Sequence, residues 1–232
     1  MAKRGSSESL VDDVYQRLRA EIYDRLLAPG ERLRPVELGQ RFGVSVGVTR
    51  DALGLLATNG LIRIERNRGF HVVTLSPAAL VDLTEARKLN EGAALRKSVL
   101  KGGVAWESEI LAAHHRMASE PMYLPDQPGV RNKVWAANHI TFHHKLIEAC
   151  ENPILLDICT RLSDAAELYR AWSVVGGETK RDIAGEHRAI LEAALAHDAD
   201  RAVALFEDHV DKTMQLVIEL EHDRPAAAKV AP

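Results

Sequence analysis

The chain has 232 residues, 46% of them hydrophobic, and carries a formal net charge of -3. A chain of this size can bury one large core or two modest ones. No run approaches the roughly 20 apolar residues of a membrane-spanning helix, and the N-terminal segment lacks the apolar core of a secretion signal. The two cysteines, Cys150 and Cys159, form no disulfide framework, which fits a reducing compartment. We therefore expect a cytoplasmic protein.

The charge is divided unevenly along the chain. Residues 1–75 carry 12 Lys and Arg against 9 Asp and Glu, net +3, whereas the remaining residues carry 18 against 24, net -6. A basic first third is typical of a part that faces nucleic acid. Pro77 can start a helix but cannot continue a preceding strand. We therefore expect two domains, residues 1–75 and residues 76–232.

The first third is expected to hold three helices. Apolar spacing predicts one over residues 10–27, followed by two short helices over 35–42 and 46–59. Gly43 allows a left-handed turn between the two short helices, and Ser45 can cap the second of them. Two short helices joined by a tight turn are the skeleton of a helix-turn-helix.

A basic hairpin is predicted directly after these helices. Two β-rich runs, 61–65 and 70–75, are joined by the turn 66–69. A helix-turn-helix with such a hairpin is a winged helix, in which the second helix of the motif enters the major groove and the wing contacts the backbone or minor groove. The predicted DNA-binding residues lie before the second helix, in the first turns of the third and at the hairpin tip: Arg34, Ser45, Thr49, Arg50, Arg66, Arg68 and Gly69.

Arg50 is the strongest candidate for reading a base. Its guanidinium can make a bidentate contact with guanine or clamp a phosphate. The alternative is that Arg50 pairs with a neighbouring carboxylate and that the wing arginines belong to a solvated turn.

The remaining two thirds show helical patterns and no strand signals, which predicts an antiparallel all-α bundle and a mainly α protein overall. Six helical runs are expected, over residues 77–101, 106–119, 130–150, 153–173, 178–197 and 199–221.

Four histidines are predicted to point into this bundle. His139 and His143 lie four residues apart on the apolar face of one helix, and His187 and His209 lie on the apolar faces of two others. Neutral imidazole is a common metal ligand, and buried polar groups need partners. We interpret the four as one metal site. The alternative is that each is a core histidine with its own local hydrogen bond.

The first third resembles the N-terminal module of the GntR family of bacterial transcription regulators. Ten positions match the usual pattern of that module: Gly43, Val44, Ser45, Arg50, Ala52, Leu53, Leu56, Gly60, Leu61 and Gly69. The resemblance implies a winged helix that binds an operator in double-stranded DNA. Residues 46–49 depart from the pattern, and Val46-Gly47 replaces the Arg-Thr pair with which the family contacts DNA.

The rest of the chain, from about residue 80 to 217, resembles the FCD ligand-binding domain of the FadR subfamily, and its six helices are similar to the VanR-type branch. The matching positions fall into four motifs: Arg87 and Glu91; Phe142, His143, Leu146, Ala149 and Asn152; Glu186, His187 and Ile190; and His209. The resemblance implies a small organic acid as effector. We therefore expect a homodimeric regulator, a repressor, in which a divalent metal and the effector modulate operator binding.

One departure from this pattern changes the expected chemistry. The family has Asp or Asn four residues before the helix histidine, where this chain has His139, and the neighbouring Asn138 is rotated away from His143. A fourth imidazole in place of a carboxylate favours Zn, Ni, Co or Cu over Mn or Mg, with Zn or Ni expected first. It also leaves the site more positive, which favours an anionic effector.

The resemblance implies Arg87 as the clamp for an effector carboxylate, although a pair with Glu91 within the same helix is an equal alternative. The other candidate effector-binding residues are Trp135, Asn138, Tyr169 and Trp172, although aromatic residues in such positions are more often plain core.

Two further functions remain open from the sequence. A metal-dependent enzyme is one, because four histidines with open coordination positions can activate water. However, Glu186 and Asp208 are expected about 100° off the ligand face, so no inward carboxylate is placed as a base. A regulator with a purely structural metal is the other.

Overall fold

The computed structural model describes residues 7–127, 129–173 and 181–222. Its contacts divide the chain into two compact units, one comprising residues up to Ser76 together with 167–172, the other residues 77–166 and 173–223. Among the described residues, no helix combines the length and the hydropathy needed to cross a membrane.

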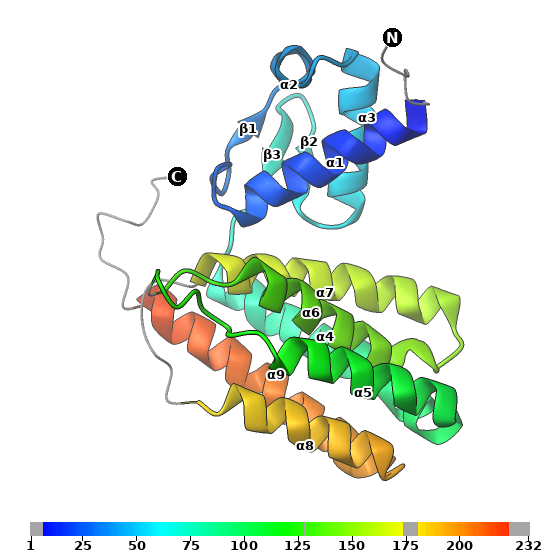
Figure 1. Cartoon of the computed structure of the whole chain (residues 1–232). Helices are drawn as coiled ribbons and strands as arrows, with labels where there is room; N and C mark the ends of the chain where they lie inside the picture. Colours follow the sequence, from blue (N-terminus) through cyan, green and yellow to red (C-terminus); the bar gives the residue numbers. More distant parts are fainter. Residues whose placement is uncertain (1–6, 128, 174–180, 223–232) are drawn as a thin grey trace. The chain divides into compact units, whose positions relative to one another are not determined.

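The predicted fold class is confirmed, with a small three-stranded sheet among many helices (Figure 1). In chain order the elements are α1 (Ser7–Tyr23), β1 (Arg32–Leu33), α2 (Pro35–Phe42), α3 (Val46–Thr58), β2 (Ile62–Glu65), β3 (Gly69–Val72), α4 (Pro77–Lys101), α5 (Val104–Ala118), α6 (Lys133–Glu148), α7 (Pro153–Ser173), α8 (Ile183–Leu195) and α9 (Ala199–His222).

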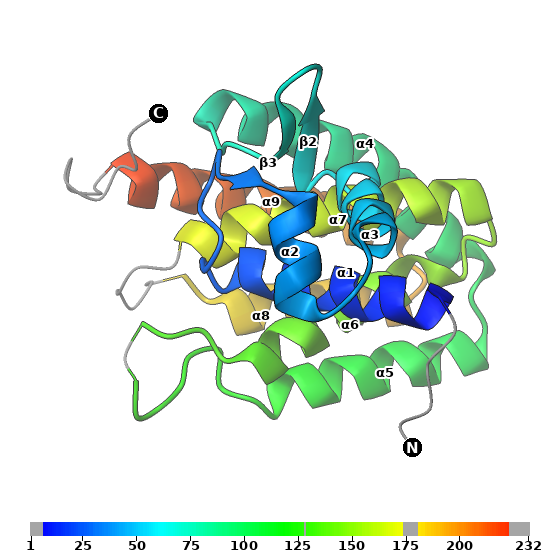
Figure 2. The same ribbon diagram turned by 90° about the horizontal axis from the view of Figure 1, so that it is seen from above.

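The first unit is a winged helix-turn-helix. Gly43 ends α2 with φ 68°, a left-handed conformation that favours glycine, and the Ser45 hydroxyl oxygen then caps α3 by accepting a hydrogen bond from the Val48 amide at 3.2 Å. Helices α1 and α2 both pack on α3, and the hairpin of β2 and β3 lies beside them (Figure 2). The core of this unit is almost entirely aliphatic, and its fully buried side chains include Leu18, Leu53, Leu56 and Leu61.

Two local predictions in this unit were wrong. Helix α1 ends at Tyr23 and not near residue 27, because Arg25 adopts a left-handed conformation with φ 62°. The two-residue strand β1 was not expected, and it pairs antiparallel with β3 through Arg32 with His71 and Leu33 with Phe70. The sheet therefore has the order β1-β3-β2.

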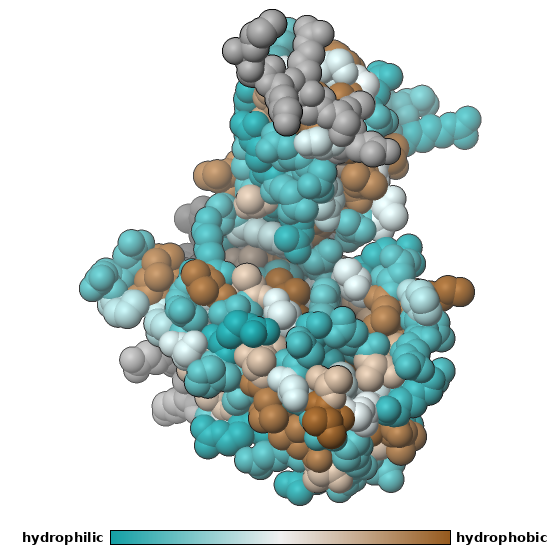
Figure 3. Space-filling model, turned by 45° about the vertical axis from the view of Figure 1, so that its right-hand side comes forward, coloured by the Kyte–Doolittle hydropathy of each residue, from teal (hydrophilic) through white to brown (hydrophobic). Residues whose placement is uncertain are grey.

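The second unit contains α4 to α6, α8, α9 and most of α7. Helix α4 packs on α6 and α9, and α8 packs on α5 and α9. Cores of this kind form because each helix buries one apolar stripe. The buried cluster draws side chains from every helix of the unit, including Val99, Ile110, Phe142, Ile190 and Phe206. The face visible in Figure 3 is mostly hydrophilic, with hydrophobic residues in scattered groups.

Capping residues explain where two helices of this unit begin. The Asn132 side chain accepts from the Val134 amide at 2.9 Å and starts α6, three residues later than predicted. The Asp182 side chain accepts from the Gly185 amide at 2.8 Å and starts α8. The predicted start of this helix at residue 178 lies outside the described residues.

His197 connects the turn after α8 to two other helices. Its Nδ1 lies 2.7 Å from the Val99 carbonyl oxygen on α4, and its Nε2 lies 2.9 Å from the Glu107 carboxylate on α5. Both partners can only accept, so both ring nitrogens donate only when the imidazole is protonated. The Val99 carbonyl, followed by Glu107, raises the pKa of His197 above its ordinary value of 6.5.

We expect His197 to stabilise the fold most at mildly acidic pH. Because its pKa is raised, the contribution is fully present below the unfolded value and is lost as the pH rises through the folded value. His197→Gln should therefore lower the thermal unfolding temperature more at about pH 6 than at about pH 8.5. His115→Gln, at an exposed histidine on α5, is the control. Equal losses at both pH values for His197→Gln would contradict this role.

Candidate functional site

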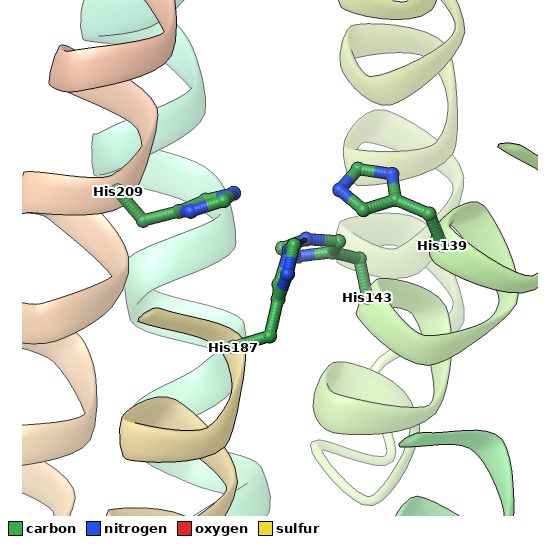
Figure 4. A group of neighbouring side chains, drawn as sticks. All are labelled: His139, His143, His187 and His209. Carbon is green, nitrogen blue, oxygen red and sulfur yellow. Dashed lines mark hydrogen bonds between the residues drawn. The ribbon is translucent and has the colours of Figure 1, made fainter. Parts of the chain in front are cut away.

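The four predicted histidines lie together inside the helical unit. One ligating atom from each of His139, His143, His187 and His209 lies within 4.8 Å of the other three, and all four residues are buried. Figure 4 shows the rings converging from three helices, α6, α8 and α9. The prediction that these side chains point inward and meet is therefore confirmed by the geometry.

Helical periodicity explains this convergence. His139 and His143 are one turn apart on α6, and their ring centroids lie 4.5 Å apart. His187 and His209 face them from α8 and α9, which pack on each other, and their own centroids are also 4.5 Å apart. The site is thus assembled from the buried stripes of three helices.

The donor set fits a divalent transition metal. Nitrogens bound to one ion at about 2.1 Å lie roughly 3.0–3.4 Å from each other in adjacent positions. The Nε2 atoms of His143 and His187 are 3.2 Å apart, within this range. The remaining separations, up to 4.8 Å, need only small side-chain movements to reach a common ion. Four imidazoles suit Zn, Ni, Co or Cu.

Burial also keeps the site in a state that can bind a cation. His187 is only 1% exposed, and this burial lowers its pKa to about 3. The ring is therefore neutral at neutral pH, and one of its nitrogens carries the lone pair that a metal ligand needs.

Aromatic side chains form the apolar surroundings of the cluster. Trp135 stacks on His139 with ring centroids 4.9 Å apart, and Phe142 packs edge-on against His187 at 5.8 Å. Phe206 on α9 lies 6.1 Å from His143. Of the aromatic residues predicted to bind an effector, Trp135 is thus next to the cluster.

Arg87 is buried close to this aromatic shell. Its guanidinium makes a bidentate ion pair with Glu91, at 2.7 and 3.0 Å, and lies 6.0 Å from the Phe206 ring centroid. Phe206 in turn contacts His143. The Nη1 group of Arg87 makes no hydrogen bond with the described residues, so the predicted pair with Glu91 exists but leaves one donor group for another anion.

Two other candidate effector-binding residues, Asn138 and Tyr169, make their hydrogen bonds away from the cluster. The Asn138 amide donates to the Arg116 carbonyl at 3.1 Å, on the side of α6 that faces α5. Tyr169 belongs to the segment 167–172, which groups with the first unit. The side chain of Trp172 lies outside the described residues. At the position that the family fills with Asp or Asn, the cluster uses His139.

A carboxylate beside the cluster was missed from the sequence. Glu186 was expected to lie off the ligand face, yet its Oε2 is 2.8 Å from Nδ1 of His209. The carboxylate reaches across from α8 to α9, and Arg181, which precedes α8, pairs with it. The sequence signals for it were the position of Glu186 directly before a predicted ligand and its match to an FCD motif. His114 on α5 is half-buried, with its ring centroid 5.3 Å from that of Phe142.

In the first unit, α3 presents some of the predicted DNA-binding residues and buries another. Arg50 is exposed and makes no ion pair with any described residue, and Ser45 is exposed at the start of the helix. Thr49 is fully buried, and its hydroxyl donates to the Ser45 carbonyl at 3.2 Å. The structure gives Thr49 a packing role in place of the predicted DNA contact, because its side chain points at α2.

The wing also presents cationic side chains. Arg66, in the turn between β2 and β3, makes no ion pair within the described part of the chain. The Arg68 side chain is 80% exposed, with Glu65 no closer than 3.8 Å. Gly69 has φ 94°, which gives it a conformational role in the turn. Arg34 is exposed but pairs with Glu37 at 2.8 Å.

Comparison with known proteins identifies the two units. Residues 10–72 match the bacterial regulatory proteins of the gntR family, and residues 82–212 match the FCD domain. The uncharacterized HTH-type transcriptional regulator BphR of Paraburkholderia xenovorans (strain LB400) is 35% identical over 214 residues, covering 90% of this chain and 85% of BphR.

Further matches agree with this assignment. The HTH-type transcriptional repressor GlaR of Escherichia coli (strain K12) is 29% identical over 202 residues, covering 85% of this chain and 91% of GlaR. The solved structure of E. coli McbR/YncC has a TM-score of 0.73 at 16% identity, covering 91% of this chain and 98% of that one, and shows the fold alone.

The relatives named here are regulators of transcription, so the enzyme alternative is not supported. Because the FCD domain matches more than half of the chain and BphR is 35% identical over most of its length, this chain belongs to the GntR family and is a DNA-binding transcription regulator with an FCD domain.

Proposed function

We propose that the FCD domain of this regulator binds one divalent transition-metal ion, Zn or Ni, through its four buried histidines. The observation that carries the proposal is the convergence of His139, His143, His187 and His209 within 4.8 Å in an apolar interior. One cation placed between the rings would take a nitrogen lone pair from each of the four imidazoles at once.

We further propose that a small organic carboxylate binds next to this ion and changes the affinity for operator DNA. Four neutral ligands leave the ion with its full positive charge and, at six-coordination, two positions for a carboxylate or waters. Arg87 supports the choice of an acid, because its free Nη1 group can donate to a second carboxylate beside Glu91.

The regulator is proposed to act in the cytoplasm as a homodimer on operators with two half-sites, because helix-turn-helix proteins commonly bind as dimers to half-sites about one helical turn apart. Repression is the proposed output, since the relative GlaR is named a repressor. Effector binding would shift the dimer between conformations with different affinities for DNA.

The metal can be tested directly by its content in purified protein. We expect about one Zn or Ni ion per chain, removable by a strong chelator. His143→Gln should lose most of the bound metal, because it removes one of the four ligands. His144→Gln, at the adjacent histidine outside the cluster, is the matched control and should retain it. Equal metal content in both variants, measured by mass spectrometry, would refute the shared site.

Arg50 should be required for tight operator binding. Loss of a bidentate base contact costs about 1–3 kcal/mol, so Arg50→Ala should weaken binding roughly 5- to 150-fold at fixed salt. DNA selected from a random pool by the wild-type protein provides the probe, with affinity measured by fluorescence anisotropy. Arg17→Ala is the control, because Arg17 is an exposed cation on α1 that pairs with Asp13. Similar losses in the two variants would show that Arg50 contributes only general charge.

Calorimetry with a panel of small mono- and dicarboxylates tests the effector site. Metal-loaded protein should bind at least one acid, and chelation should weaken that binding. Arg87→Gln combined with Glu91→Gln should weaken it as well, and the double change avoids leaving a buried unpaired charge. Acid binding that is indifferent to chelation would favour the alternative of a purely structural metal.

A further inference from the structure

A hydrogen-bonded network borders the histidine cluster on the side of α8 and α9. Arg181 donates to both carboxylate oxygens of Glu186, to the His209 carbonyl at 2.8 Å and to the Thr213 hydroxyl oxygen at 2.9 Å. The Arg181 and Glu186 side chains are only 12% and 16% exposed. The Arg181 guanidinium therefore fixes the position of the Glu186 carboxylate, and it also donates a hydrogen bond to the backbone of α9.

The same network determines which nitrogen of His209 faces the cluster. Glu186 Oε2 lies 2.8 Å from Nδ1, and a carboxylate can only accept, so Nδ1 must carry the proton. Nη2 of Arg181 is also 3.2 Å from Nδ1, but its two hydrogens already serve Glu186 and the His209 carbonyl. The lone pair of His209 is therefore on Nε2.

We propose that Glu186 is a positioning residue for the metal centre, with Arg181 as its anchor. Glu186 holds His209 in the tautomer and orientation that present Nε2 to the other three imidazoles, and it makes that imidazole a stronger donor. The inference rests on the proposed metal function and deepens it. Glu186 directly precedes the ligand His187 on α8, yet the ligand that it orients is His209 on α9.

A matched control lies on the same surface. The network borders an open hollow of about 790 Å³ between α8 and α9, whose lining includes Asp208 and Lys212. These two side chains pair with each other at 2.6 Å. Asp208→Asn therefore removes one ion-paired carboxylate from the same hollow, and the Asp208 side chain makes no hydrogen bond with His209.

The experiment compares full-length wild type, Glu186→Ala, Glu186→Gln and Asp208→Asn after removal of metal. Zn²⁺ affinity is measured by competition with a chromogenic chelator, and the ligand field is read from the visible spectrum with Co²⁺. We expect Glu186→Ala to lose about 10- to 100-fold in Zn²⁺ affinity and to change the Co²⁺ spectrum. Glu186→Gln should lose less, because its side-chain oxygen still accepts from Nδ1, and Asp208→Asn should match wild type.

Wild-type Zn²⁺ affinity and an unchanged Co²⁺ spectrum in Glu186→Ala would overturn the positioning role while leaving the metal site intact. Failure of the wild type to bind either ion would instead refute the proposed metal function, and the positioning role with it. The two failures are therefore distinguishable.

A measurement on the wild type does not depend on the folding of any variant. In Zn²⁺-loaded protein with ¹⁵N-labelled histidine, His209 should show a protonated Nδ1 and a metal-bound Nε2. Metal coordination through Nδ1 of His209 would overturn the proposal, because that nitrogen then has no proton to donate to Glu186.

Discussion

The helical domain depends on placing four imidazole rings from three helices in one small buried volume. Polar rings are costly to bury unless their nitrogens are satisfied, so this arrangement constrains the positions of α6, α8 and α9 along their axes. The rings lie among the buried side chains of Phe142, Phe206 and Trp135, and electrostatic interactions are stronger in such apolar surroundings than in water. A cation bound there would couple folding of the bundle to metal binding.

In the DNA-binding domain, neighbouring side chains of α3 have different roles, one in packing and one at the exposed surface. Thr49 faces Gly39 on α2. A Cβ atom added at Gly39 would lie only 3.3 Å from the Thr49 hydroxyl oxygen, so the two helices of the motif approach closely at this point. Arg50, the next residue, is exposed. One turn of α3 thus packs against α2 through Thr49 and exposes the Arg50 cation. The exposed residues Val46 and Gly47, which precede them, carry no hydrogen-bonding side chain.

Features that depend on local sequence were predictable. Helices α2, α4 and α7 have the predicted bounds, because a proline starts each of them, and the four histidines lie on the faces that helical periodicity assigns. Features that depend on tertiary contact were not. The end of α1 follows from one left-handed residue, Arg25, and β1 exists only through its pairing with β3. Glu186 reaches His209 on another helix, which no pattern within α8 reveals.

The adjacency of Glu186 and His187 has a mechanical consequence. His187 belongs to the cluster, and Glu186 accepts a hydrogen bond from the His209 ring on α9. A displacement of α8 would therefore move the His187 ring directly and would act on the His209 ring through its hydrogen bond to Glu186. A change at the cluster would in the same way reach α8 by two routes, through the His187 ring and through the contact between His209 and Glu186.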